Sequence, residues 1–123
     1  MSGGSQDNAA LDAIRWFAIN PLNNTVLAQG ILTDSNNSFY YGSIAVSTTG
    51  AIVIDFAESG ASQHISTYLA TGTFNGTSVA MGTPTLLRAG TGIYVQQNLA
   101  PGAAARWGDY STVQVDPNNP SEF

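Results

Sequence analysis

Short runs of β-branched and aromatic residues, interrupted by turn residues such as Asn75-Gly76, recur along most of the chain. About eight or nine such runs, with a turn every 8–12 residues, are typical of an all-β sandwich, barrel or propeller. No window carries apolar residues at the spacing of an amphipathic helix. The pattern therefore predicts an all-β, antiparallel chain. The expected strands are residues 13–19, 25–33, 40–47, 51–58, 64–74, 77–82, 83–90, 92–97 and 109–116.

The run at residues 51–58 predicts a strand that is covered on both faces. Ile52, Ile54 and Phe56 alternate along one face. The opposite face is also apolar, with Val53, except for Asp55. Apolar residues on both faces indicate a central strand of a stacked sheet. Asp55 would then be a partly buried carboxylate that needs hydrogen-bond donors.

An aromatic run, Phe39 to Tyr41, opens the expected strand before it. In a regular strand Phe39 and Tyr41 share one face and Tyr40 lies on the other. Core packing is the default interpretation, and an exposed Tyr40 could contribute its ring to a glycan site.

Charge excludes two classes of partner. The chain has 123 residues, enough for one domain, and a formal net charge of −5 with only three basic residues. Nucleic-acid binding needs a basic surface, and an anionic membrane would repel this chain. No apolar run approaches the ~18 residues of a membrane span. Charged residues make up only 9 %, so solubility must come from Ser, Thr, Asn and Gln, as on many extracellular β-proteins.

The first ten residues differ in composition from the rest. Residues 1–10 have neither the basic nor the apolar region of a signal peptide. We expect them to be a flexible leader and residues 11–123 to form a single β domain. If the protein is secreted, its signal sequence lies upstream of this chain.

Arg106, Trp107, Asp109 and Tyr110 gather in one short segment around Gly108. Arg106 and Asp109 are close enough to form an ion pair, and Gly108 permits a positive φ between them. One interpretation is architectural: the Arg–Asp pair fixes the conformation of the segment over the indole of Trp107. A second is a ligand platform, in which the two aromatic rings stack on a sugar. A catalytic role for Asp109 is a third. The four side chains named first are our candidate ligand-binding residues.

Other residues offer little catalytic chemistry. Glycoside hydrolysis needs two carboxylates at a set separation, but Asp55 and Glu58 lie three apart and tend toward opposite faces of a strand. His64 is the sole histidine and the chain has no cysteine, which disfavours a zinc site or a triad. The calcium-like loop from Asp34 lacks the required Gly and Glu. We therefore expect no catalytic residue, metal or cofactor, although enzymatic activity stays open.

From about residue 40 to the end, the chain resembles bacterial secreted and surface proteins with sialidase-like β-propeller repeats. In that family an Arg-Trp-Gly-Asp-Tyr-Ser segment precedes an Asp-Pro and then a Phe-Trp; here the segment is residues 106–111, followed by Asp116-Pro117 and Phe123. The sialidase Asp-box is absent. The resemblance implies an extracellular or cell-surface location. It also implies a propeller fragment, because a propeller needs at least four blades of about four strands each.

These observations lead to expectations that the structure can test. The fold is antiparallel and all-β, built of propeller-type hairpins; the alternative is a small sandwich or barrel. The function is a non-catalytic extracellular binding or structural module directed at carbohydrate. One alternative is part of a sialidase-like glycoside hydrolase propeller. The other is a fragment whose open strand edges pair with further copies into a homo-oligomer.

Overall fold

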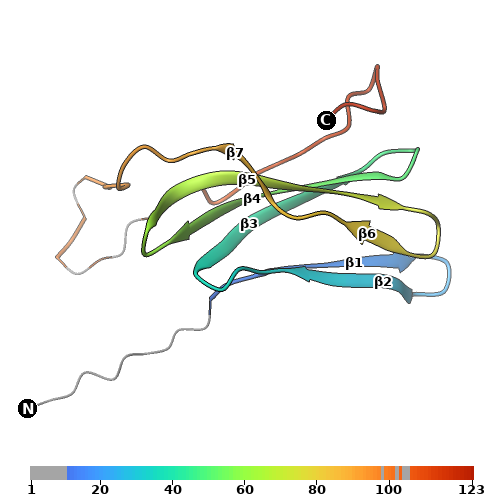
Figure 1. Cartoon of the computed structure of the whole chain (residues 1–123), viewed down its shortest axis with the longest axis horizontal. Helices are drawn as coiled ribbons and strands as arrows, with labels where there is room; N and C mark the ends of the chain where they lie inside the picture. The colour runs from blue at the N-terminus through green and yellow to red at the C-terminus, as the bar shows by residue number, and fades with distance from the viewer. Residues whose placement is uncertain (1–10, 98, 102, 104–105) are drawn as a thin grey trace, which may run out of the picture.

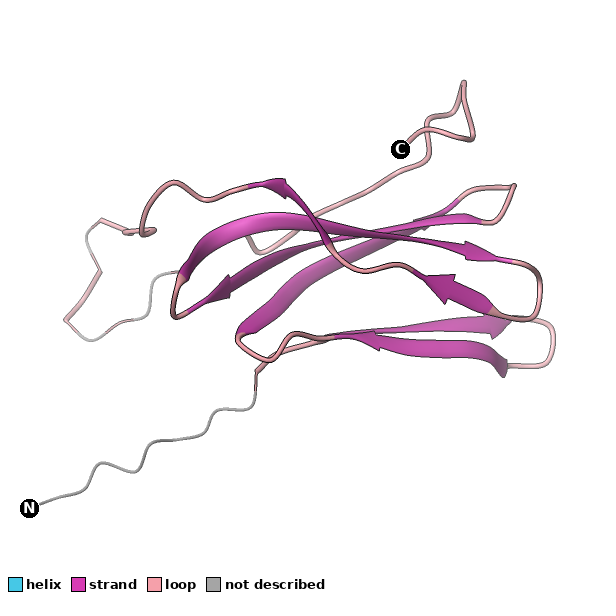
Figure 2. Ribbon diagram, in the orientation of Figure 1, coloured by secondary structure: helices cyan, strands magenta, loops and turns pink. Residues whose placement is uncertain are grey.

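The structure is a computed structural model, and it describes residues 11–97, 99–101, 103 and 106–123. Every helix or strand in these ranges is a β-strand (Figure 2), which confirms the all-β prediction. Accordingly, the described ranges hold no helix capable of crossing a membrane. The expected leader, residues 1–10, lies outside the described residues. The strands are β1 (Ile14–Asn20), β2 (Thr25–Leu32), β3 (Asn37–Val46), β4 (Ala51–Gly60), β5 (Gln63–Phe74), β6 (Val79–Met81) and β7 (Thr85–Arg88).

The first sheet is the antiparallel hairpin of β1 and β2, as the sequence predicts (Figure 1). Asparagine side chains build its turn. Asn20 Oδ1 accepts the Leu22 N–H at 2.9 Å, and Asn23 Oδ1 accepts the Thr25 N–H at 3.2 Å. Asn24 adopts a φ of 56°, a left-handed conformation that asparagine tolerates better than most residues. The turn residues therefore determine where this hairpin reverses.

The second sheet is an antiparallel meander of β3, β4 and β5 whose fourth position is shared by two short strands. β6 pairs with the C-terminal part of β5, and β7 pairs with its middle. Pro84 lies between them and has no N–H to donate to a ladder. Gly82 bridges the break, because its N–H donates to the Thr71 carbonyl at 2.8 Å. The two runs predicted at residues 77–82 and 83–90 thus lie along one edge of β5.

The core lies between the hairpin and one face of the larger sheet. Ile54 and Phe56 of β4 are almost fully buried, and Leu32 of β2 joins the same cluster. Ile14 and Trp16 of β1 pack against this cluster from the hairpin side. The predicted alternation of Ile52, Ile54 and Phe56 and the central position of β4 are confirmed, while the face that carries Asp55 is only partly buried. The buried apolar residues are Leu32, Phe39, Ile52, Ile54, Phe56 and Ala70.

Two predicted strands are wrong. Residues 109–116 run beside β3 but bond to it through side chains: the Ser111 hydroxyl donates to the Tyr41 carbonyl, and the Val113 N–H donates to Ser43 Oγ at 3.1 Å. Residues 92–97 follow a point where the Gly90 N–H donates to Ser66 Oγ, 2.9 Å away. In residues 109–116 side chains have replaced backbone groups as bonding partners, so this segment does not extend the ladder of β3. Residues 92–97 likewise form no strand.

The barrel alternative is also wrong, because the described strands form two open sheets. No β-ladder joins the hairpin to the larger sheet in the described ranges; a backbone bond from the Phe39 N–H to the Asp12 carbonyl, 3.0 Å long, lies at their junction. Two antiparallel sheets that share one core have the layering of a small sandwich. A propeller stays a prediction.

Candidate ligand-binding site

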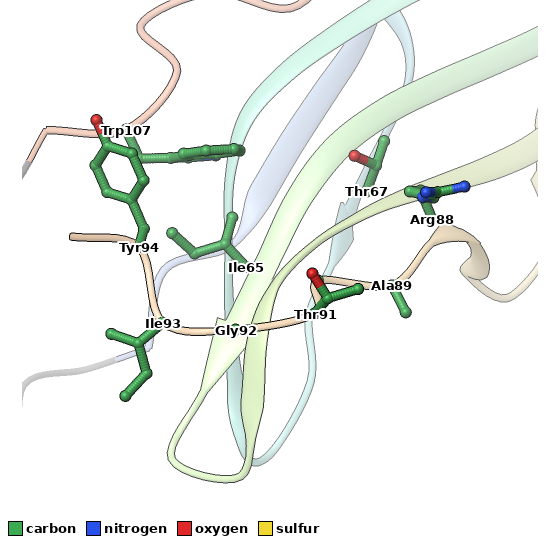
Figure 3. Close-up of a pocket in the computed structure, with 10 residues that line it drawn as sticks. Ile65, Thr67, Arg88, Ala89, Thr91, Gly92, Ile93, Tyr94 and Trp107 are labelled. Carbon is green, nitrogen blue, oxygen red and sulfur yellow. The ribbon is translucent and has the colours of Figure 1, made fainter. Parts of the chain in front are cut away.

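An aromatic pair lies over the outer face of the larger sheet, the face opposite the core. The rings of Tyr94 and Trp107 meet edge-on, with their centroids 5.1 Å apart and their planes at 70°. Figure 3 shows the indole of Trp107 beside the ring of Tyr94, with Ile65 of β5 below it in this view. Trp107 is 40 % exposed. Edge-to-face packing against Tyr94 therefore holds the indole while leaving much of it open to solvent.

Three adjoining cavities border Trp107, and we number them by size. Cavity 1 has a volume of about 400 Å³, cavity 2 about 250 Å³ and cavity 3 about 160 Å³. Thr67 is shared by cavities 1 and 3, and Tyr94 by cavities 1 and 2. Cavity 1 is lined by Ile65, Thr67, Arg88–Tyr94 and Trp107; cavity 2 by Ser59, Gln63–Ile65, Gly92–Tyr94 and Trp107; cavity 3 by Tyr41, Asp55–Ala57, Thr67, Trp107, Gly108, Tyr110 and Ser111.

The segment that carries Trp107 is held by its neighbours. Arg106 and Asp109 form the predicted ion pair, with Arg106 Nη2 2.8 Å from Asp109 Oδ2. Gly108, between them, has the predicted positive φ, 39°. The Arg106 N–H also donates to Gln96 Oε1 at 2.9 Å. An exposed ion pair contributes only about 0.2–1 kcal/mol, so these contacts orient the segment more than they stabilise the fold.

The four predicted site residues divide into two pairs. Trp107 and Tyr110 line the cavities, although Tyr110 is 94 % exposed and lies at the rim. Arg106 and Asp109 bond to each other and line none of the three cavities. The geometry therefore fits both the architectural and the ligand-platform interpretation of this segment. The Arg–Asp pair holds the segment in place, and the aromatic rings line the cavities. Ligand binding by any of the four stays a prediction.

Asp55 is the carboxylate of this site. It lies on the outer face of β4 opposite Ser43 of β3 and Leu69 of β5, and it lines cavity 3. Its Oδ1 atom is buried and accepts no hydrogen bond from any residue that the structure describes. The sequence predicted a partly buried carboxylate in need of donors. Among the described residues, no donor reaches Oδ1 of Asp55.

Tyr41 reaches the outer face, contrary to the prediction that it shares a face with Phe39. Phe39 is buried in the core, whereas Tyr41 lines cavity 3. A β-bulge between Tyr40 and Ser43 interrupts the alternation, and Tyr41 adopts a φ of 55° there. A bulge re-aims the side chain that it carries. The glycine after Tyr41, inside an otherwise regular strand, is the sequence signal that could have indicated this bulge.

Glu58, the other carboxylate of β4, lies on the inner face, which confirms that it and Asp55 point apart. It is 5 % exposed. Glu58 Oε1 accepts hydrogen bonds from Asn37 Nδ2 at 2.8 Å and from Gln63 Nε2 at 3.2 Å. Burial raises the pKa of Glu58 above its ordinary value of 4.5, and the charge of Asp34 raises it further, while the two amide hydrogen bonds lower it.

Comparisons with known proteins do not extend this description. No protein-family model matches the chain, and neither the curated proteins nor the solved structures contain a significant match. The site is therefore interpreted from its own geometry.

Proposed function

We propose that this chain is a non-catalytic binding module of an extracellular or cell-surface protein, directed at carbohydrate. The observation that carries the proposal is the indole of Trp107, half-exposed and held edge-on by Tyr94 beside three adjoining cavities. A flat aromatic ring offers an apolar plate to the C–H face of a sugar ring. A surface that is poor in charge and rich in hydroxyl and amide groups is consistent with an extracellular location.

Polar groups around the aromatic pair supply the directional contacts that a sugar needs. Thr67 contributes a hydroxyl and Arg88 a guanidinium to cavity 1, while Asp55 contributes a carboxylate to cavity 3. Binding sites for small molecules commonly combine apolar walls with a few such polar groups. The volume of cavity 1, about 400 Å³, lies within the range of about 300–1,000 Å³ found for such sites.

The carboxylates favour binding over hydrolysis. A glycoside hydrolase requires two carboxyl groups across the scissile bond. Asp55 is the only carboxylate among the described residues that line the three cavities, and Glu58 lies on the other face of the sheet. The hydrolase alternative would therefore need a second carboxylate from elsewhere.

Isothermal titration calorimetry with a panel of neutral oligosaccharides tests the proposal. We expect at least one to bind, and Trp107→Ala to weaken that binding on the order of tenfold or more, because a tryptophan that the ligand covers contributes much of the binding energy of a contact surface. Phe17→Ala is the matched control, since Phe17 is a half-exposed aromatic residue of β1 outside the three cavities. No binding by any member of the panel, or equal binding by Trp107→Ala, would contradict the proposal. Turnover of a fluorogenic glycoside would contradict its non-catalytic part.

A second candidate function is self-association into a homo-oligomer. The β1–β2 hairpin exposes apolar side chains, and β2 has no ladder partner on its outer edge among the described strands. Free strand edges pair readily with another chain. The β3–β4–β5 meander with β6 and β7 at its fourth position also has the strand order of a propeller blade, and several copies could form a ring. The exposed apolar residues of the hairpin are Phe17, Ile19, Leu22, Val26, Leu27 and Ile31.

A further inference from the structure

Cavity 3 differs from its neighbours because it combines a carboxylate with aromatic residues. It lies between the middle of the larger sheet and the segment that carries Trp107 and Tyr110. Asp55 comes from β4, and Tyr41 comes from the bulge of β3. Its volume, about 160 Å³, is below the range of about 300–1,000 Å³ that is usual for a whole small-molecule ligand. The cavity is therefore suited to one functional group of a larger ligand.

The carboxylate of Asp55 indicates which charge that group carries. Oδ1 of Asp55 is buried and receives no donor from the described ranges of the chain. A buried carboxylate oxygen without a hydrogen bond is strongly unfavourable, and a positive charge beside it offsets that penalty. Arg106 is bonded to Asp109 instead. Arg88, the register partner of Thr67, lines cavity 1 and not cavity 3. A cation in cavity 3 would lie near the Asp55 carboxylate and offset its charge through space.

The aromatic lining favours a cation over a neutral donor. Trp107 and Tyr41 line the cavity and are each partly exposed, and Tyr110, which also lines it, is almost fully exposed. Aromatic faces attract ammonium groups through the negative charge above the ring plane. The net charge of −5 adds a favourable field for any cation that approaches the chain.

The backbone of β3 is strained where it delivers Tyr41 to the cavity. Its φ of 55° is uncommon for a residue with a side chain, and strain of this kind clusters at ligand sites. The Ser111 hydroxyl bonds the carbonyl of Tyr41 and thereby ties the C-terminal segment to the bulge. Two segments far apart in the sequence are thus held together around Asp55.

We propose that cavity 3 binds an organic ammonium group, with Asp55 as its counter-ion and Trp107 and Tyr41 as its aromatic walls. Two ligand classes carry such a group: amino sugars with a free amine, and compounds with a choline-type quaternary ammonium. This site goes beyond the glycan function proposed above, because it does not require neutral sugars to bind at cavity 1.

The test compares charged probes with uncharged ones of similar shape. Choline is titrated against 3,3-dimethylbutan-1-ol, and glucosamine against glucose, with the wild-type chain in calorimetry or NMR. We expect at least one cation to bind on the order of tenfold more tightly than its neutral counterpart. Preference for choline would show that the ligand of cavity 3 carries a quaternary ammonium, and preference for glucosamine would show that it carries a primary amine. Equal binding of the charged and neutral members of both pairs would overturn the proposal.

Asp55→Asn is the decisive variant. Asparagine keeps the shape of Asp55 and one acceptor oxygen while removing the charge, so cation binding should fall on the order of tenfold with no loss of thermal stability. Unchanged cation binding would overturn the proposal. Neutral oligosaccharides supply the control for cavity 1: if they still bind and no cation preference exists, only the ammonium site fails. Cation binding without oligosaccharide binding would contradict only the glycan function.

Discussion

Gly50 illustrates how much a single backbone position contributes to this fold. It ends the β3–β4 turn with a φ of 86°, and a Cβ added there would collide with the carbonyl oxygen of Phe74. The Phe74 N–H in turn donates to the Gly50 carbonyl at 2.7 Å. The position thus requires glycine for its conformation and also for the close approach of β5.

We expect Gly50→Ala to lower the free energy of unfolding by about 1–3 kcal/mol, because alanine is strained at a positive φ and has no room there. Urea denaturation measures the change. Gly76→Ala separates the two causes, since Gly76 has a φ of 98° but no atom within 4 Å of an added Cβ. Gly92→Ala has neither feature and should stay within about 0.5 kcal/mol of the wild type. Equal stability of all three variants would show that the turn accommodates alanine.

Glu58 gives the stability of the fold a predictable pH dependence. Burial raises its pKa above 4.5, so the folded state holds the proton more tightly than the unfolded state. Its contribution to stability is therefore fully present below the unfolded pKa and is lost as the pH rises through the folded pKa. We expect the thermal midpoint to fall from about pH 4.5 upward, and Glu58→Gln to flatten that fall. Glu122→Gln, at an exposed position near the C-terminus, is the control. An unchanged slope in Glu58→Gln would contradict this assignment.

Among the elements, the β1–β2 hairpin depends most on its packing. A two-stranded hairpin is marginally stable by itself in water, and this one is held by Ile14, Trp16 and Leu32 against the larger sheet. Trp16 also lies so close to Gly30, its cross-strand partner, that a Cβ there would collide with the indole. The hairpin is therefore shaped to place one large ring over the core.

Two leucines of this hairpin region form a matched pair. Leu32 is 7 % exposed in the core, whereas Leu22 is 93 % exposed in the turn. We expect Leu32→Ala to lower the free energy of unfolding by about 2–5 kcal/mol through lost burial and the cavity left behind. Leu22→Ala should change it by less than about 0.5 kcal/mol. Thermal or urea unfolding measures both, and a similar cost for the two would mean that the hairpin does not dock on the core.

At the scale of the whole molecule, the two sheets remain open, and apolar side chains stay on the hairpin surface. Val26 and Ile31 of β2 are both more than half exposed. Exposed apolar side chains that gather on one element favour contact with another protein. The acidic charge of the chain keeps copies apart at low ionic strength, so any association must come from apolar contact and strand pairing.

Light scattering behind a sizing column tests this association. We expect a mass that is a multiple of the 12.8 kDa chain. Ile31→Lys should shift the mass toward one chain, because a charge on the strand surface opposes edge pairing. Leu22→Lys, in the turn rather than on the strand, should leave the mass unchanged. A well-folded wild-type monomer across the measured concentrations would rule out the homo-oligomer.

The sequence by itself determined the all-β class, the strands from β1 to β7 and the turns at Asn23-Asn24 and Asn75-Gly76. Alternation and turn chemistry act between neighbouring residues, so both can be read locally. The alternation of Ile52, Ile54 and Phe56 along β4 and the pairing of Arg106 with Asp109 were predictable for the same reason. The tertiary structure decided the rest. It turned Tyr41 outward, kept residues 92–97 and 109–116 out of any ladder, and brought Asp55 beside Trp107, because these features depend on contacts between segments distant in the chain.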